Sequence, residues 1–236
     1  GPAVMDRVRR VVEELRDRSV KSKQKMRGLE VIRGRGRLTG PQTLVVEGGD
    51  GEREIRARSV VIATGASPVR PDFLPWDSGR VWTSDEACRT ETLPYSVFIM
   101  GGGVIGCEFA TAYAELGRPT VLVEMQQRLL PELAGEAGQA VAARLEARGV
   151  QIACGRKVTA MTPAGEGVRV EIEGGGTFQA HRALVAVGRR ANLEGIGLEA
   201  AGVRVGPEGV LRVDDRCRTN VENVYAAGDC AERLQY

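Results

Sequence analysis

The stretch from Ser96 to Glu124 constrains the fold of this chain more than any other. It reads SVFIMGGGVIGCEFATAYAELGRPTVLVE, and Gly101, Gly103 and Gly106 follow the spacing G-x-G-x-x-G. An apolar run precedes the glycines, a segment of small and apolar residues follows them, and a second apolar run ends in Glu124. This order of strand, glycine turn, helix, strand and acid predicts the start of a parallel α/β sheet with a dinucleotide site.

Each glycine of the turn has its own physical reason. Gly101 allows a tight turn, Gly103 lets the backbone approach a pyrophosphate, and Gly106 lets the helix pack close to its strand. The free N–H groups at the start of the helix would bind phosphate. The expected nucleotide-binding residues of this turn are Gly101, Gly102, Gly103, Val104, Ile105 and Gly106.

Glu124 lies at the end of the second strand, 18 residues after Gly106. A carboxylate there can accept hydrogen bonds from both hydroxyls of an adenine ribose and would repel a 2′-phosphate, so we expect NAD rather than NADP. Two plainer interpretations remain open. The G-x-G-x-x-G spacing occurs in ordinary glycine turns, and Glu124 would also suit a solvated strand end.

Composition narrows the class of protein. The chain has 236 residues, 42% of them hydrophobic, which is enough for one large or two modest domains. It contains no apolar run that would span a membrane and no signal-like start, so we expect a soluble cytoplasmic protein without a membrane partner.

The cysteines and the histidine indicate neither a metal site nor a catalytic group. No two of the five cysteines are close in sequence, which argues against a disulfide framework and suits a reducing compartment. The single histidine, His181, has no nucleophile or acid arranged around it, and we expect it at the surface. No catalytic residue is predicted in this chain. The cysteines are Cys88, Cys107, Cys154, Cys217 and Cys230.

Basic residues are concentrated at the start of the chain. Residues 1–37 contain twelve Lys and Arg against five acids, although the net charge of the whole chain is only +2. No aromatic residues are interleaved with them, as a nucleic-acid surface would require. We therefore expect a solvated helix face and no nucleic-acid partner.

The first part of the chain combines a helix with short strands. Apolar residues recur at helical spacing between Val4 and Leu15, which predicts an amphipathic helix over residues 3 to about 26. An antiparallel meander is expected next, with strands at 29–38, 43–47 and 52–57. Residues 59–63 form an apolar run typical of a strand buried on both faces of a parallel sheet. Prolines at 68, 71 and 75 indicate an irregular connection up to residue 95.

After Glu124 the pattern is that of an α/β domain. A helix is predicted over 135–148 and a parallel strand over 150–153. Residues 157–180 predict short alternating strands, and 183–187 another apolar strand. The last strand is expected at 224–227.

Four motifs occur in one order: ATGASP at 63–68, GGGVIGCEFA at 101–110, VGRRAN at 187–192 and VYAAGD at 224–229. As a set they resemble the pyridine nucleotide-disulfide oxidoreductase family. The segments GCEFA and LVEM are most similar to those of its dihydrolipoamide dehydrogenase branch. The resemblance covers essentially the whole chain.

The resemblance implies where FAD would bind. Thr64 and Gly65 would lie at a crossover beside FAD, and Asp229 would hydrogen-bond a ribityl hydroxyl. A short carboxylate at the carboxyl end of a strand suits that role, because ligands bind at this edge of α/β sheets. A helix cap is the other interpretation of Asp229.

The resemblance also extends the NAD site. Val158 and Gly188 match backbone positions that line the adenine and nicotinamide pockets. Glu108 matches a carboxylate that pairs with a lysine beside the flavin. This chain lacks that lysine, so Glu108 is equally interpreted as a polar helix residue.

The implied architecture is a Rossmann-like NAD-binding domain, with a three-layer parallel sheet and a β-meander, inserted in parts of an FAD-binding domain. Residues 1–93 would be the end of the first FAD segment with the crossover, 94–190 the NAD domain, and 191–236 the return to the FAD domain. The sequence lacks the first G-x-G-x-x-G of the family, its C-x-x-x-x-C disulfide and its dimerisation domain with a His/Glu pair. We therefore expect a central fragment that is inactive alone.

The implied function is electron transfer between a dithiol and NAD through FAD. The dithiol would be a small molecule or a lipoyl domain, and the full-length family member would be a homodimer. Two alternatives remain: a stand-alone NAD(H)-binding module, and a relative of mercuric or glutathione reductase.

Overall fold

The computed structural model describes residues 2–24, 26–49 and 51–231. The chain divides into two compact units. Unit 1 comprises Gly1–Val20 and Pro68–Gly188, and unit 2 comprises Lys21–Ser67 and Arg189–Tyr236. Along the chain, the segment 68–188 thus lies between the two parts of unit 2.

A five-stranded sheet forms the centre of unit 1. Its strands run in the order β6 (Val81–Trp82), β13 (Arg182–Val185), β7 (Val97–Met100), β8 (Thr120–Glu124) and β9 (Gln151–Cys154). Every neighbouring pair is parallel. The predicted parallel α/β sheet is confirmed, with strand ends shifted by one or two residues.

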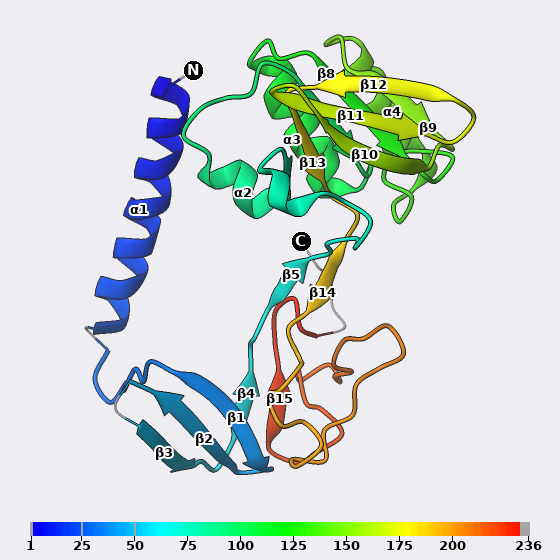
Figure 1. The fold of residues 1–236 in the computed structure, drawn as a ribbon. Helices are drawn as coiled ribbons and strands as arrows, with labels where there is room; N and C mark the ends of the chain where they lie inside the picture. The colour runs from blue at the N-terminus through cyan, green and yellow to red at the C-terminus, as the bar shows by residue number, and fades with distance from the viewer. Residues whose placement is uncertain (1, 25, 50, 232–236) are drawn as a thin grey trace. The chain divides into compact units, whose positions relative to one another are not determined.

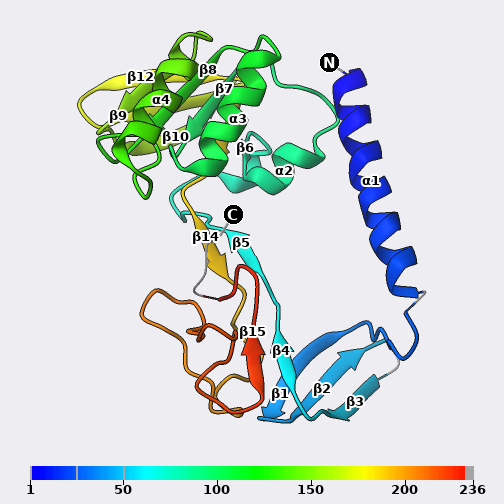
Figure 2. The ribbon, with the colours of Figure 1, turned by 180° about the vertical axis from the view of Figure 1, so that it is seen from behind.

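The two faces of this sheet are covered by different layers. Helices α3 (Val104–Glu115) and α4 (Gly135–Glu146) pack on one face, as seen from behind in Figure 2. The antiparallel strands β10 (Val158–Ala164), β11 (Gly167–Ile172) and β12 (Gly176–Ala180) cover the other face, towards the viewer in Figure 1. The predicted three layers and the meander are therefore present.

Alternation along the strands produces two separate apolar cores. Successive side chains of a strand point to opposite faces. Val97 and Ile99 accordingly pack with the helices, whereas Phe98 between them packs with the meander. In β8, Leu122 joins the helix side and Val123 the meander side.

Unit 2 begins with the expected meander. Strands β1 (Arg35–Gly40), β2 (Thr43–Gly48) and β3 (Gly51–Arg56) pair antiparallel in that order. The predicted first strand, 29–38, was wrong in its first half, because residues 29–34 are not a strand. Arg35 already pairs with Glu47 near the end of β2, so earlier residues have almost no partner strand left.

The other strands of unit 2 form two pairs. β4 (Val60–Ile62) pairs in parallel with β15 (Val224–Ala226), and β5 (Ala66–Pro68) pairs with β14 (Arg189–Ala191). The expectation that 59–63 is buried on both faces was wrong. Val61 is 63% exposed whereas Ile62 is 5% exposed. The reason is that this sheet has two strands in the described chain, and its core packs on one face of them.

Helix α1 (Pro2–Gln24) confirms the predicted helix over 3–26. The apolar side chains in the middle of this helix are not buried, however. Val11, Val12 and Leu15 are 45%, 54% and 60% exposed. None of the described helices has the length and apolar content needed to cross a membrane.

The connection expected to be irregular contains the short helix α2 (Ser84–Arg89). Thr83 and Glu86 form a capping box at its start, in which the Glu86 carboxylate accepts a 2.7 Å bond from the Thr83 N–H. The S/T-x-x-E spacing of this box is a recognisable helix signal. The surrounding prolines favour a loop, and for that reason the sequence pattern predicts an irregular connection here.

Candidate nucleotide-binding site

The glycine turn lies at the carboxyl end of β7. Gly101 has φ +110°, a conformation that favours glycine, and its N–H donates to the Val123 carbonyl at 2.8 Å. A Cβ at Gly101 would lie 2.3 Å from the Ala186 carbonyl oxygen just beyond β13. The turn therefore runs tightly between neighbouring strand ends, and only glycine suits its first position.

Close packing also requires the last glycine of the motif. A Cβ at Gly106 would lie 1.9 Å from the Gly101 carbonyl oxygen. That distance is far below van der Waals contact, and backbone atoms would have to shift to relieve it. Gly106 thus allows α3 to start directly against the turn.

Gly103 differs from these two glycines. Its φ of −72° and ψ of −173° are ordinary extended values, and a Cβ there would meet nothing within 4 Å. Neither backbone conformation nor packing requires glycine at this position. The open space lies at the N-cap of α3, where a glycine leaves room for a ligand to approach the backbone.

The first turn of α3 offers backbone donors at this open space. The first helical hydrogen bond is that of the Cys107 N–H, which donates to the Gly103 carbonyl at 3.0 Å. The N–H groups of Val104, Ile105 and Gly106 precede it and have no acceptor inside the helix. With the partial positive charge of a helix N-terminus they suit an anion such as pyrophosphate.

Glu124 contacts the same turn. One carboxylate oxygen accepts a 2.6 Å bond from the Gly102 N–H, and the other accepts a 2.7 Å bond from the Gln126 N–H. The residue is 8% exposed. Glu124 is therefore not a solvated strand end. Because each carboxylate oxygen has two lone pairs, acceptor capacity towards a ribose hydroxyl remains.

The loop after Glu124 also forms hydrogen bonds that hold the glycine turn in place. The Leu130 N–H donates to the Gly102 carbonyl at 2.8 Å, so both polar groups of the Gly102 residue are fixed. The Gly155 N–H donates to the Gln126 carbonyl at 2.7 Å. Sequence reasoning missed Gln126 and Leu130, and no signal was available, because their backbone rather than their side chains makes the contact.

The remaining residues expected around NAD differ in their exposure. Gly188 has φ +119° and is exposed just past β13, at the same sheet edge as Gly101. Val158 is 3% exposed and packs in the meander-side core, so its side chain does not line a surface. Glu108 is exposed on α3.

The structure brings together the two motifs ATGASP and VGRRAN in unit 2. Asn192 donates from its backbone to the Gly65 carbonyl at 2.9 Å and from its side chain to the Thr64 carbonyl at 3.1 Å. The Ser67 hydroxyl donates to the Asn192 side-chain oxygen at 2.8 Å. These bonds hold the segment after β4 beside β14.

The third motif of unit 2, VYAAGD, is joined by an ion pair. Arg189 Nε lies 3.5 Å from Asp229 Oδ2, and Arg189 Nη2 donates to the Ala66 carbonyl at 2.6 Å. Asp229 follows β15 and Thr64 follows β4, and these strands are parallel neighbours. Thr64, Gly65 and Asp229 therefore share one sheet edge.

The thiols are not joined in a disulfide. All five cysteines lie in the described chain and are free. Burial, and then the Glu124 carboxylate, raise the pKa of Cys107 to about 11, and burial raises the pKa of Cys154. Both stay protonated near neutral pH and are poor nucleophiles. The described residues contain no cluster of His, Cys, Asp and Glu that would hold a metal ion.

Comparison with known proteins gives a family match over almost the whole chain. Residues 3–236 match the family model described as pyridine nucleotide-disulphide oxidoreductase. Dihydrolipoyl dehydrogenase of Vibrio cholerae serotype O1 is 35% identical over 209 residues, covering 87% of this chain and 44% of that protein. The Zymomonas mobilis protein of the same name is 37% identical over 217 residues, covering 90% and 46%. The chain spans about half the length of the curated relatives it matches.

Solved structures show the same likeness. The HOCl-induced flavoprotein disulfide reductase RclA from Escherichia coli matches with a TM-score of 0.90 and 28% identity, covering 100% of this chain and 53% of that chain. LpdA from Mycobacterium tuberculosis matches with a TM-score of 0.89 and 31% identity, covering 100% and 52%.

Proposed function

The chain belongs to the pyridine nucleotide-disulphide oxidoreductase family, and on that premise we propose that unit 1 binds NAD at its glycine turn and that unit 2 forms part of an FAD site. The family is one of oxidoreductases that use FAD and a pyridine nucleotide. One observation carries the proposal for NAD. Gly103 is a glycine that neither conformation nor packing requires, and it faces open space at the start of α3.

In unit 1 the residues of the turn would hold the nucleotide. The N–H groups at the start of α3 would bind the pyrophosphate, and Glu124 would accept hydrogen bonds from the adenine ribose. The backbone at Val158 and Gly188 would line the adenine and nicotinamide ends. We assign the NAD-binding domain to residues 94–190, and Glu108 would face the flavin side of this site.

In unit 2 the residues after β4 and β15 would contact FAD. Thr64 and Gly65 would approach it with their backbone, and Asp229 would bind a ribityl hydroxyl. Arg189 beside Asp229 would orient that carboxylate, because a guanidinium group is a directional partner for carboxylate oxygens. Of the expected FAD-domain segments 1–93 and 191–236, we assign Lys21–Ser67 and residues 191–236 to the FAD-binding domain, because Gly1–Val20 and residues 68–93 belong to unit 1.

The proposed reaction of the whole protein is the oxidation of dihydrolipoamide to lipoamide with reduction of NAD. FAD and the nicotinamide supply the electron transfer when bound, and the chain supplies binding and orientation. The natural dithiol would be a small molecule or a lipoyl domain. The setting would be the cytoplasm, and the full-length protein would be a homodimer.

Affinity for the two nicotinamide nucleotides tests the NAD assignment. Calorimetric titration of the purified chain should give a clearly lower Kd for NADH than for NADPH, because Glu124 repels a 2′-phosphate. NAD preference also separates this proposal from an NADP-dependent glutathione reductase relative. Equal affinities would remove Glu124 from its assigned role, and no binding of either nucleotide would contradict the proposal itself.

An activity assay tests the proposed reaction. With added FAD and dihydrolipoamide we expect no NADH formation from this chain, since dithiol oxidation requires a disulfide as electron acceptor and a base. The same assay on a chain extended by the family's disulfide and His/Glu segments should show activity. Comparable rates from both chains would show that those segments are not the catalytic machinery.

A further inference from the structure

A cavity of about 670 Å³ lies in unit 1, away from the glycine turn. Its lining includes Arg80 just before β6, Tyr95 before β7, Arg118 before β8 and Arg182 at the start of β13. In a parallel sheet these strand starts all lie at the amino edge. The glycine turn follows the carboxyl end of β7, so the cavity and the proposed NAD site occupy opposite edges of one sheet.

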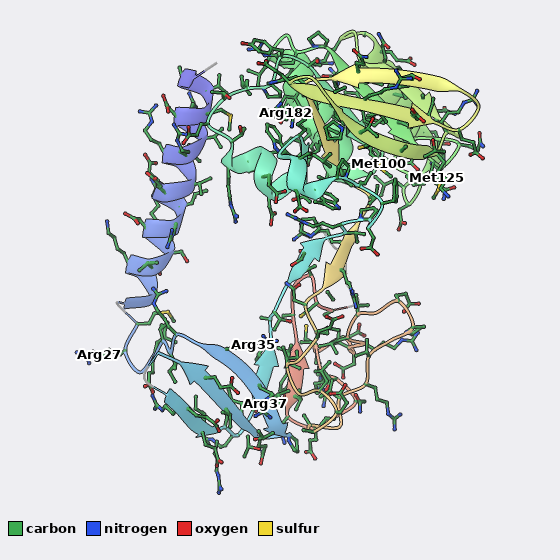
Figure 3. The ribbon with its side chains drawn as sticks, viewed as in Figure 1. Arg27, Arg35, Arg37, Met100, Met125 and Arg182 are labelled. Carbon is green, nitrogen blue, oxygen red and sulfur yellow. The ribbon has the colours of Figure 1, made fainter. Side chains whose placement is uncertain are left out.

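Arg182 and Met100 mark these two edges in Figure 3. Arg182 pairs in register with Val97 at the start of β7, whereas Met100 ends β7 immediately before the turn. Three residues of strand separate these positions, a distance of about 10 Å. The cavity is therefore a separate feature, and an inference from it does not rest on the proposed function.

Three guanidinium groups line this cavity. The Nε atoms of Arg80, Arg118 and Arg182 are buried, and none of them has a hydrogen-bond partner among the described residues. Burying a polar atom without a partner costs free energy, on the order of 1–3 kcal/mol and more for charged groups. These Nε atoms are closed to the cavity itself, so a ligand there would be attracted by the charges of the three guanidinium groups and would not bond to Nε.

Two of these side chains are held in place by the protein. Arg80 donates through Nη2 to the Gly165 carbonyl at 2.7 Å and through Nη1 to the Ser78 carbonyl at 3.1 Å. Arg182 Nη1 donates to the His181 carbonyl at 2.6 Å and to the Glu166 carbonyl at 3.0 Å. All four acceptors are neutral carbonyls, so the positive charges are positioned but not neutralised.

The charge balance of the lining is positive. Glu166 provides the one carboxylate in the lining, against the three arginines. Burial, and then the neighbouring Arg80, lower the pKa of Arg182, as expected for cations crowded without enough counter-charge.

A histidine adds a further donor. His181 Nδ1 accepts a 3.2 Å bond from the Tyr95 N–H, which leaves the proton of the neutral ring on Nε2. His181 is partly exposed, as expected for a residue at the surface, and it also lines the cavity.

We propose that this cavity binds the phosphate group of a small organic molecule. Arginine guanidinium groups present forked donors that match phosphate oxygens, and such bonds are stronger than those between neutral groups. The volume lies within the range of about 300–1,000 Å³ typical of small-molecule sites, which is larger than inorganic phosphate needs. Leu93 and Tyr95 would contact the organic part. The ligand is thus an organic phosphate rather than a bare ion.

Titration with phenyl phosphate, at constant ionic strength, tests this proposal. The arginine Nε–H signals in ¹⁵N-correlated NMR spectra report changes in the surroundings of each guanidinium group. Saturable shifts of the signals of Arg80, Arg118 and Arg182 are expected, with NADH present or absent. Inorganic phosphate should bind more weakly, and citrate more weakly still.

Single substitutions then assign the binding to the cavity. Arg118→Gln should weaken phenyl phosphate binding at least fivefold, and Glu166→Gln should strengthen it severalfold by removing the one carboxylate. Arg144→Gln, an exposed position on α4, is the charge-matched control and should bind as the wild type does. All three variants should keep the wild-type affinity for NADH, which shows that the chain is folded.

Three results would overturn the proposal. They are the absence of saturable shifts at the three arginines, equal phenyl phosphate affinity of the Arg118→Gln and Arg144→Gln variants, and tighter binding of citrate than of phenyl phosphate. Failure of the chain to bind NADH would contradict the NAD assignment and would leave this measurement intact.

Discussion

The carboxylate of Glu124 accepts a 2.6 Å hydrogen bond from the backbone N–H of Gly102. This contact joins the end of β8 to the middle of the glycine turn, 22 residues earlier in the chain. The residue expected to recognise the ribose therefore also fixes the loop expected to bind the pyrophosphate. Changes at Glu124 should affect both parts of the site together.

The first prediction follows from that double role. Glu124→Gln replaces one carboxylate oxygen by an amide NH₂, which then faces the N–H of Gly102 or Gln126 instead of accepting from it. Loss of one charge-assisted bond costs about 1.5–3 kcal/mol. Urea unfolding should show a stability loss of that order, and calorimetry a more than tenfold weaker binding of NADH. Glu146→Gln, an exposed change on α4, is the control. Unchanged stability together with weaker NADH binding would limit Glu124 to ribose recognition.

The second prediction separates two glycines of one motif. Gly103→Ala places a methyl group in open space and should change stability by no more than about 1 kcal/mol, the cost of alanine at an N-cap. It should nevertheless weaken NADH binding tenfold or more, because the methyl group occupies the space of the pyrophosphate. Gly106→Ala puts a Cβ 1.9 Å from a carbonyl oxygen and should destabilise the fold by about 3 kcal/mol or more. Wild-type NADH affinity in Gly103→Ala would contradict the proposed position of the nucleotide.

The third prediction compares two neighbouring arginines of VGRRAN. Arg189 pairs with Asp229 and with the Ala66 carbonyl, whereas Arg190 forms an exposed ion pair with Glu194. Arg189→Gln should destabilise unit 2 by about 1–3 kcal/mol, and Arg190→Gln by less than about 0.5 kcal/mol.

Hydrogen exchange measures this difference locally. The amides of β5 and β14 should exchange faster in Arg189→Gln than in Arg190→Gln. Equal exchange in the two variants would show that the Arg189 contacts do not hold these strands together.

The fourth prediction concerns alkaline pH. The pKa of Cys107 is about 11 in the folded chain, above the ordinary thiol value, so the folded state holds this proton more tightly than the unfolded state. The resulting stability is fully present below about pH 8.5 and is lost as pH rises towards 11. Cys107→Ala should therefore lose less unfolding free energy than the wild type between pH 8 and pH 10.5, measured by urea unfolding. Parallel pH profiles would contradict the burial of this thiol.

Much of unit 1 could be predicted because its signals are local. The apolar strands, the glycine spacing and the terminal Glu124 each lie within a few residues of one another, and periodicity detects such patterns well. The capping box at Thr83 was equally local but stood among prolines, and α2 was missed for that reason. The strands β5 and β14 are three residues each, too short for any periodic pattern.

The unpredicted parts depend on contacts between distant segments. The exposure of Val61 follows from which elements cover β4, which an apolar run does not reveal. The cavity gathers arginines from positions 80, 118 and 182, and no spacing rule links them. Backbone contacts such as that of Leu130 do not restrict the residue type, so the sequence does not reveal them. The sequence thus indicated the residues of the proposed NAD site, whereas the contacts that hold them together became visible only in the fold.

The sheet of unit 1 separates the core beneath its helices from the core beneath the meander. Phe98 and Ile99 are neighbours in the chain, yet each packs into a core that the other does not enter. A substitution that repacks the meander against Phe98 leaves the contacts between Ile99 and the layer of α3 untouched. A change in the core on the meander side should therefore alter stability without direct contact with the layer beside the glycine turn.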